Sequence, residues 1–199
     1  GTPYVYQGQE IGMTNYPWSS LDELDDLQSI GKVEAAIASG EIDGFDDVKQ
    51  AVRDKSRDNA RTPMQWDDTE HAGFTDGEPW LPVNPNYEDI NVAAAEADPD
   101  SVLHYYRELV ELRSAHEVLV YGAYNLLLPD HESVWAYRME LDDDAVLVAL
   151  NVDDTETSVT LEDAARTEEL LCSNYDPPTE TGPALTLRPY EARVYQLEA

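Results

Sequence analysis

The spacing of hydrophobic residues changes near residue 117. Before that point, apolar residues recur every three or four positions, the spacing of one face of a helix, and a long irregular segment interrupts them. From residue 119 onward, apolar and polar residues alternate, which is typical of strands with one buried face. The pattern predicts a helical N-terminal part and an antiparallel β C-terminal part.

The first apolar run, residues 2–6, has the aromatic and β-branched composition of a buried strand, and it ends at Gly8. A strand that is buried on both faces needs a neighbour on each side, and nothing precedes this one in the chain. We therefore expect residues 2–6 to lack strand partners here.

Helix signals follow. Ser20 precedes Glu23 by three residues, which is the spacing of a capping box and predicts a helix from about Leu21. Gly31 is expected to interrupt this helix, and Gly40 is expected to end its second piece.

A further short helix is expected over residues 46–55. Residues 57–99 are rich in Pro, Gly, Asn and Asp and read as one long irregular segment, which in a compact domain is usually functional. Because the segment carries Trp66 and Trp80, we expect it to be packed down rather than disordered.

The C-terminal part begins after the clearest helix signal. Asp98 and Pro99 supply an N-cap and a first-turn proline for a helix over residues 101–115. Turn residues then separate short alternating runs at regular spacing, which favours a β-sandwich or barrel. The candidate strands are residues 121–128, 133–141, 145–151, 156–161, 168–173, 184–188 and 192–197.

The chain is strongly acidic, with 42 acidic and 12 basic residues and a formal net charge of −30. Such a surface repels nucleic-acid phosphates and anionic membranes, so we expect neither as a partner. The acids are spread along the whole chain, which indicates a halophilic protein whose self-repulsion is screened by salt. No apolar run is long enough to cross a bilayer and no secretory signal is visible, so a cytoplasmic location is predicted.

The cysteine and histidine residues do not indicate a metal site or a reactive thiol. The single cysteine, Cys172, lies in an apolar stretch and is expected to be a buried, inert thiol. His71, His104, His116 and His131 show no paired-ligand spacing, so we predict no metal and no cofactor.

One polar motif stands out. Residues 56–66 read Ser-Arg-Asp-Asn-Ala-Arg-Thr-Pro-Met-Gln-Trp, with Arg57 and Arg61 four residues apart. Arginine presents planar donors that suit a carboxylate or adjacent hydroxyls. From spacing alone, these arginines form either local ion pairs on a solvated loop or part of a ligand site.

The motif also carries a family resemblance. The opening GTPYVYQGQEIGMTN, the stretch RDNARTPMQW and the following HAGFTDGEPWLPVNPNY resemble the α-glucosidases of glycoside hydrolase family thirteen, above all the oligo-1,6-glucosidase group, and the match continues to residues 187–192. The resemblance implies an α/β plus all-β chain. Residues 1–117 would supply the last strand, long loop and last helix of a (β/α)8 TIM barrel. Residues 118–199 would form a C-terminal antiparallel β-sandwich domain. The chain would then be the C-terminal portion of a longer enzyme.

Enzymes of this family are retaining, with one carboxylate as nucleophile and another as acid. The resemblance places these groups on earlier barrel strands, upstream of Gly1, so we assign no catalytic residue here. It implies that Arg57 closes the end of the glucose pocket and binds a small oligosaccharide substrate. Arg61 is a weaker candidate that more simply orders the loop. Gln9 and Glu10 would line the leaving-group side, and a structural role for Glu10 stays open.

Aromatic residues have two interpretations each. Trp66, Trp80 and Tyr87 could stack on sugar faces or anchor the long loop onto the barrel, and we favour the anchor. Trp135 alternates with Tyr137 in a predicted strand and is expected in the sandwich core.

Three functions fit the resemblance. The first is an α-glucosidase acting on α-1,4- or α-1,6-linked oligosaccharides from the non-reducing end. The second is a glucosyl isomerase or transferase that forms trehalose or isomaltulose. The third is a non-catalytic relative that acts as a binding or interaction protein. The isolated chain is expected to be inactive, and no oligomeric state is predicted.

Overall fold

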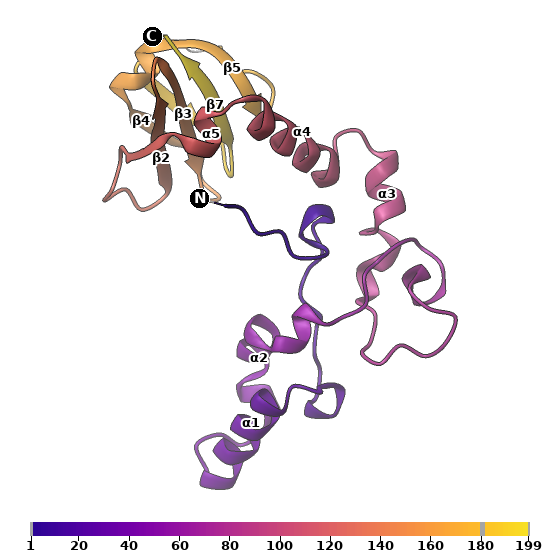
Figure 1. Ribbon diagram of the computed structural model, residues 1–199. Coiled ribbons are helices and arrows are strands. Elements are labelled where there is room, and N and C mark those ends of the chain that lie inside the picture. The colour runs from indigo at the N-terminus through magenta and orange to yellow at the C-terminus, as the bar shows by residue number, and fades with distance from the viewer. Residues whose placement is uncertain (1, 180–181, 199) are drawn as a thin grey trace. The chain divides into compact units, whose positions relative to one another are not determined.

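The computed structural model describes residues 2–179 and 182–198. The chain divides into two compact units (Figure 1). Residues 4–106 form the first, here called the helical unit, and residues 107–199 with residues 1–3 form the second, here called the sheet unit. The domain bounds expected from the sequence, 1–117 and 118–199, remain a prediction.

The opening run has no strand partner in the described part of the chain. Residues 2–6 are extended but unpaired, and the side chain of Tyr4 is 92% exposed. The chain then turns at Gly8, whose φ of 91° is left-handed, into the 3-10 turn η1 (Gln9–Ile11). The expectation that this run lacks partners is confirmed.

The first helix begins later than the sequence pattern predicts. Leu21–Glu23 is only a 3-10 turn, η2, and the side chain of Ser20 accepts no capping hydrogen bond. Helix α1 (Leu27–Ser39) starts after Asp26, whose carboxylate accepts a hydrogen bond from the backbone N–H of Gln28. The capping-box prediction is wrong because the carboxylate of Glu23 instead accepts bonds from the backbone N–H and hydroxyl of Ser19.

Glycines act differently at the two predicted positions. Helix α1 runs through Gly31 without a break, so the predicted interruption is wrong; one glycine costs a helix only about 1 kcal/mol. Gly40, with a φ of 74°, ends the helix as predicted, because glycine adopts this left-handed conformation without a Cβ clash.

A small apolar core holds the helical unit together. The 3-10 turn η3 (Phe45–Asp47) leads into α2 (Lys49–Lys55), which confirms the predicted short helix. One residue from each helix packs against a fully buried tryptophan and two leucines. The cluster consists of Trp18, Leu24, Val33, Val52 and Leu81.

The long irregular segment is largely built of single turns, as predicted. It also contains one short helix that the pattern missed, α3 (Val92–Ala97), capped by Asn91, whose side-chain oxygen accepts from the N–H of Ala94 at 2.7 Å. The segment then leads to the expected helix, α4 (Val102–Ala115). Asp98 is not its N-cap as predicted, because Asp98 ends α3 and the hydroxyl of Ser101 accepts the N–H of His104 at 3.4 Å. The turns are η4 (Arg57–Ala60), η5 (Glu70–Gly73) and η6 (Pro85–Glu88).

The sheet unit contains the predicted strands. A five-stranded antiparallel sheet has the order β1-β2-β3-β7-β5, and β4 pairs with β6 (Figure 1). A short helix that alternation could not distinguish from a strand, α5 (Val118–Tyr121), and the 3-10 turn η7 (Glu162–Arg166) complete the unit. The strands are β1 (Ala123–Leu126), β2 (Val134–Leu141), β3 (Asp144–Asn151), β4 (Thr157–Thr160), β5 (Thr167–Ser173), β6 (Ala184–Leu187) and β7 (Ala192–Leu197).

Trp135 does not lie in the core. Val134 and Ala136 point into the main apolar cluster of the sheet unit, so Trp135, between them on β2, faces the other way and is 49% exposed. Its indole N–H donates to the hydroxyl of Tyr124 at 2.9 Å. The core prediction for Trp135 is therefore wrong, whereas the predicted burial of Cys172 is confirmed.

Candidate functional site

The arginine motif forms a tightly tied turn in the helical unit. Ser56 accepts the N–H of Asp58 on its hydroxyl at the start of η4. The side chain of Asp58 is completely buried. Its Oδ2 accepts the backbone N–H groups of Asp25 and Asp26 at 2.8 Å and 2.7 Å, just before helix α1.

A second carboxylate makes the same kind of contact in the opposite direction. Oδ2 of Asp26, which is also buried, accepts the backbone N–H of Arg57 at 3.1 Å and the hydroxyl of Ser29 at 2.7 Å. Burial raises the pKa of Asp26, but the hydrogen bonds from Ser29, Arg57 and Gln28 outweigh it, and the pKa falls below its usual value. The carboxylate therefore stays ionised at neutral pH.

The two arginines have different environments. Nη1 of Arg61 lies 3.1 Å from Oδ1 of the buried Asp58, so Arg61 forms a local ion pair. The side chain of Arg57 is exposed, and within the described part of the chain its guanidinium has no recorded hydrogen-bond or ion-pair partner. The ion-pair alternative thus describes Arg61, whereas the donors of Arg57 remain available to a ligand.

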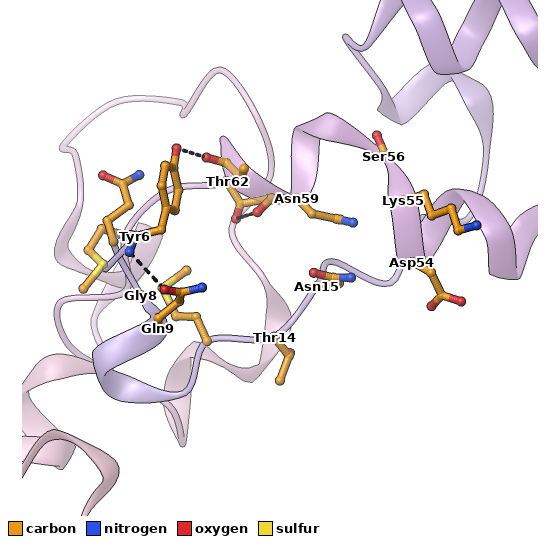
Figure 2. Close-up of a pocket in the computed structure, with 14 residues that line it drawn as sticks. Tyr6, Gly8, Gln9, Thr14, Asn15, Asp54, Lys55, Ser56, Asn59 and Thr62 are labelled. Carbon is orange, nitrogen blue, oxygen red and sulfur yellow. Dashed lines mark hydrogen bonds between the residues drawn. The ribbon is translucent and has the colours of Figure 1, made fainter. Parts of the chain in front are cut away.

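A cleft of about 300 Å³ with a mixed polar and apolar lining lies beside this turn (Figure 2). The hydroxyl of Tyr6 donates to the carbonyl of Ala60 at 2.6 Å, and Oε1 of Gln9 accepts the N–H of Tyr6 at 3.0 Å. The first bond joins the opening segment to the arginine motif, and the second lies within the opening segment. Other lining residues include Thr14, Asn15, Asp54, Ser56, Asn59 and Thr62.

The structure brings together only part of the predicted site. Gln9 lines the cleft, whereas Arg57, Arg61 and Glu10 do not; the neighbours of Arg57 in the motif, Ser56 and Asn59, do. Oε2 of Glu10 is buried and has no hydrogen-bond partner in the described residues. A buried carboxylate oxygen normally has a hydrogen-bond partner, so Oε2 of Glu10 differs from the buried oxygens of Asp26 and Asp58.

Sequence reasoning missed the side chain of Asn59. Its oxygen accepts the indole N–H of Trp18 at 2.8 Å, and its amide donates to the carbonyl of Arg53 at 2.7 Å. The middle of the motif is thereby attached to the apolar cluster of the helical unit. The only signal in the sequence was the position of Asn59 between two arginines, which does not identify a partner 41 residues away.

The aromatic residues of the long segment leave both interpretations open. Trp66 and Trp80 are 50% and 69% exposed, and Tyr87 is half-buried. The two tryptophans are therefore only partly covered by the described residues. Sugar stacking and anchoring to another part of the enzyme both remain predictions for these rings.

The described residues contain neither a metal-binding cluster nor a membrane-spanning helix. No group of three or more His, Cys, Asp or Glu side chains has the arrangement of a metal site there. Within the same residues, no helix has the length and hydropathy needed to cross a membrane.

The sequence matches a known family over the whole helical unit and beyond it. A profile described as "Alpha amylase, catalytic domain" matches residues 1–122. The chain belongs to the alpha-amylase family. A second profile, "Alpha-amylase SusG C-terminal domain", matches residues 134–194. These two matches confirm the resemblance read from the motifs and the predicted order of barrel-family segment and antiparallel C-terminal domain.

Curated relatives align with this alpha-amylase family chain over nearly its whole length. It is 47% identical to the oligo-1,6-glucosidase of Bacillus cereus, over 100% of this chain and 36% of the relative. It is 45% identical to the oligo-1,6-glucosidase of Parageobacillus thermoglucosidasius, over 99% of this chain and 35% of the relative. The chain therefore spans about a third of the length of these curated relatives.

A solved structure gives the same result. The isomaltulose synthase of Klebsiella sp. LX3 superposes with a TM-score of 0.92 at 40% identity, covering 99% of this chain and 35% of that one. Nearly the whole chain therefore shares the fold of this enzyme, and it corresponds to only part of the enzyme's length.

Proposed function

We propose that this chain is the C-terminal portion of a retaining α-glucosidase that removes glucose from the non-reducing end of α-1,4- or α-1,6-linked oligosaccharides. The main support is the pair of oligo-1,6-glucosidases that are 47% and 45% identical across the whole chain. A neutral oligosaccharide also suits a surface with a net charge of −30. We further propose a cytoplasmic location, which fractionation of the source cells would test.

In this proposal the chain supplies a wall of the substrate pocket and not the reacting carboxylates. Hydrolysis with retention needs a nucleophilic carboxylate and a carboxylic acid on opposite sides of the glycosidic bond. We place both in the portion of the enzyme that precedes this chain. Arg57 would donate hydrogen bonds to the hydroxyls of the terminal glucose, or to a carboxylate that closes the pocket.

The single observation that carries this role is the unpaired guanidinium of Arg57. In a chain with 42 acidic and 12 basic residues, an exposed arginine readily finds a carboxylate, as Arg61 does. Arg57 instead sits on a turn fixed by buried bonds, and its side chain has no recorded partner in the described residues. Gln9 and Glu10 are proposed to lie on the leaving-group side, and the unsatisfied oxygen of Glu10 fits a partner from elsewhere in the enzyme or from substrate.

Kinetics of the longer enzyme test the proposal. Arg57→Ala should raise KM and lower kcat for maltose or isomaltose, because a substrate contact is lost. Lys49→Ala is the matched control, since Lys49 is a cation of the same unit with a surface partner, Asp46, at 3.6 Å. Equal kinetics for the two variants would contradict the role of Arg57. Turnover of p-nitrophenyl α-glucoside by the pure chain alone would contradict the location of the carboxylates.

Isomerisation is the second candidate, because the similar solved structure is that of an isomaltulose synthase. Sucrose offered to the longer enzyme separates the two functions. A hydrolase releases glucose and fructose, whereas an isomerase forms isomaltulose as the main product. We favour hydrolysis because the relatives with the higher identity are glucosidases.

A further inference from the structure

We propose that Asp26 and Asp58 are positioning residues for Arg57. Together they form a reciprocal lock, in which each carboxylate accepts backbone N–H groups from the segment that carries the other. The inference rests on the proposed function, in which the side chain of Arg57 lies at the glucose pocket and the lock holds it there.

The geometry of the lock is mutual. Asp58, in the arginine motif, receives the N–H groups of Asp25 and Asp26. Asp26, at the start of α1, receives the N–H of Arg57 itself. The two segments lie 31 to 33 residues apart in the chain, so the bonds are tertiary contacts and not local turns.

Both carboxylates are committed to the lock. Asp58 is fully buried and Asp26 is 4% exposed, so neither can exchange its partners for water. Asp58 is further paired with Arg61 through its other oxygen, and Asp26 is further bonded to Ser29 and Gln28. Bonds from N–H groups to a charged carboxylate are among the stronger hydrogen bonds in proteins.

The lock acts on the backbone of Arg57, the residue that is proposed to bind the substrate. The lock fixes the N–H of Arg57, and the hydroxyl of Ser56 accepts the N–H of the next residue, Asp58, so the direction in which the Arg57 side chain leaves the backbone is set. The side chain itself retains much rotamer freedom until it binds. A backbone fixed in advance reduces the ordering required on binding, and a shift of about 1 Å in such a group can cost up to about 100-fold in rate.

A double-mutant cycle in the longer enzyme tests this inference. Asp26→Ala and Asp58→Ala should each lower kcat/KM for isomaltose about tenfold, with most of the change in KM. In an Arg57→Ala background the same substitutions should lower kcat/KM less than twofold, because the group they position is already gone. A tenfold loss that persists in the Arg57→Ala background would overturn the proposal.

Asp47→Ala is the matched control. Asp47 also accepts two backbone N–H groups in a turn of the helical unit, those of Asp43 and Gly44, but it holds no part of the arginine motif. This variant should leave kcat/KM within twofold. Asp58→Asn should recover part of the activity lost in Asp58→Ala, because the amide oxygen can still accept the N–H groups of Asp25 and Asp26.

Hydrogen exchange provides a readout that does not depend on activity. In the intact enzyme, Asp26→Ala and Asp58→Ala should speed amide exchange in peptides that contain Arg57, and Asp58→Asn should leave their exchange slower than Asp58→Ala does. Unchanged exchange in both alanine variants would overturn the lock itself. Unchanged kinetics in Arg57→Ala, with faster exchange in Asp26→Ala, would instead contradict the proposed function of Arg57 and, with it, the positioning role. The two failures are therefore distinguishable.

Discussion

The Nε atom of Arg193 lies 2.7 Å from Oε1 of Glu191, and both side chains are buried, with 2% and 0% of their surface exposed. Arg188 contacts both oxygens of the same carboxylate, with Nη2 at 2.8 Å from Oε1 and Nε at 3.1 Å from Oε2. One buried carboxylate thus forms ion pairs with two arginines in the sheet unit. Pairs of this kind are fragile when one member is removed, because the remaining charge stays buried.

Removing this acid should destabilise the sheet unit strongly. Glu191→Ala leaves Arg193 buried without its carboxylate, and we expect a loss of about 3–5 kcal/mol in the free energy of unfolding, measured with urea. Glu140→Ala is the control, because Glu140 is 41% exposed in its ion pair with Arg138 and should cost less than about 1 kcal/mol. Similar losses in the two variants would contradict this account.

The same carboxylate should make stability depend on acidic pH. Burial raises the pKa of Glu191, but hydrogen bonds from Arg188 and Arg193 outweigh it and lower the pKa from 4.5 to about 2. A lowered folded-state pKa stabilises the protein above the unfolded value and loses that contribution as pH falls from about 4.5 toward 2. The contribution is about 3 kcal/mol at most.

Urea unfolding at several pH values measures this effect. The free energy of unfolding of the wild type should fall across that window, whereas Glu191→Gln should show a flatter profile because its amide does not titrate. A variant profile as steep as that of the wild type would assign the acid sensitivity to other carboxylates.

Two glycine-to-alanine substitutions should have opposite signs. Gly8 has a φ of 91°, and a Cβ there would lie 2.5 Å from Sδ of Met13, so Gly8→Ala should destabilise the protein by about 1–2 kcal/mol. Gly31 lies within α1 with open space around it, so Gly31→Ala should stabilise the protein by about 0.5–1 kcal/mol. Thermal unfolding measures both, and a stabilising Gly8→Ala would show that the left-handed turn is not maintained.

Salt should stabilise this chain. With 42 acidic and 12 basic residues, self-repulsion opposes the compact state, and added salt screens it. We expect the Tm to rise as KCl increases from about 0.1 M, where the screening length is about 10 Å, to about 1 M, where it is about 3 Å. A Tm that falls over this range would contradict the halophilic interpretation.

Several features followed from the sequence alone. Alternating hydrophobic residues located the seven predicted strands, because the period of two belongs to the backbone of a strand and needs no knowledge of its neighbours. The motifs around Gly8 and Arg57 were long enough to indicate the family that the profile match then confirmed. The unpaired state of residues 2–6 also followed from the sequence, because their composition is that of a buried strand and no preceding strand is available to pair with them.

Other features depended on tertiary contacts. Alternation in β2 gave two faces but did not identify the buried one, and packing placed Val134 and Ala136 inside and Trp135 outside. The start of α1 was decided by Asp26, a carboxylate held by the N–H of Arg57, which is 31 residues away. A local pattern records only the chemistry of neighbours in sequence, whereas these choices depend on which distant groups the folded backbone brings within hydrogen-bonding distance.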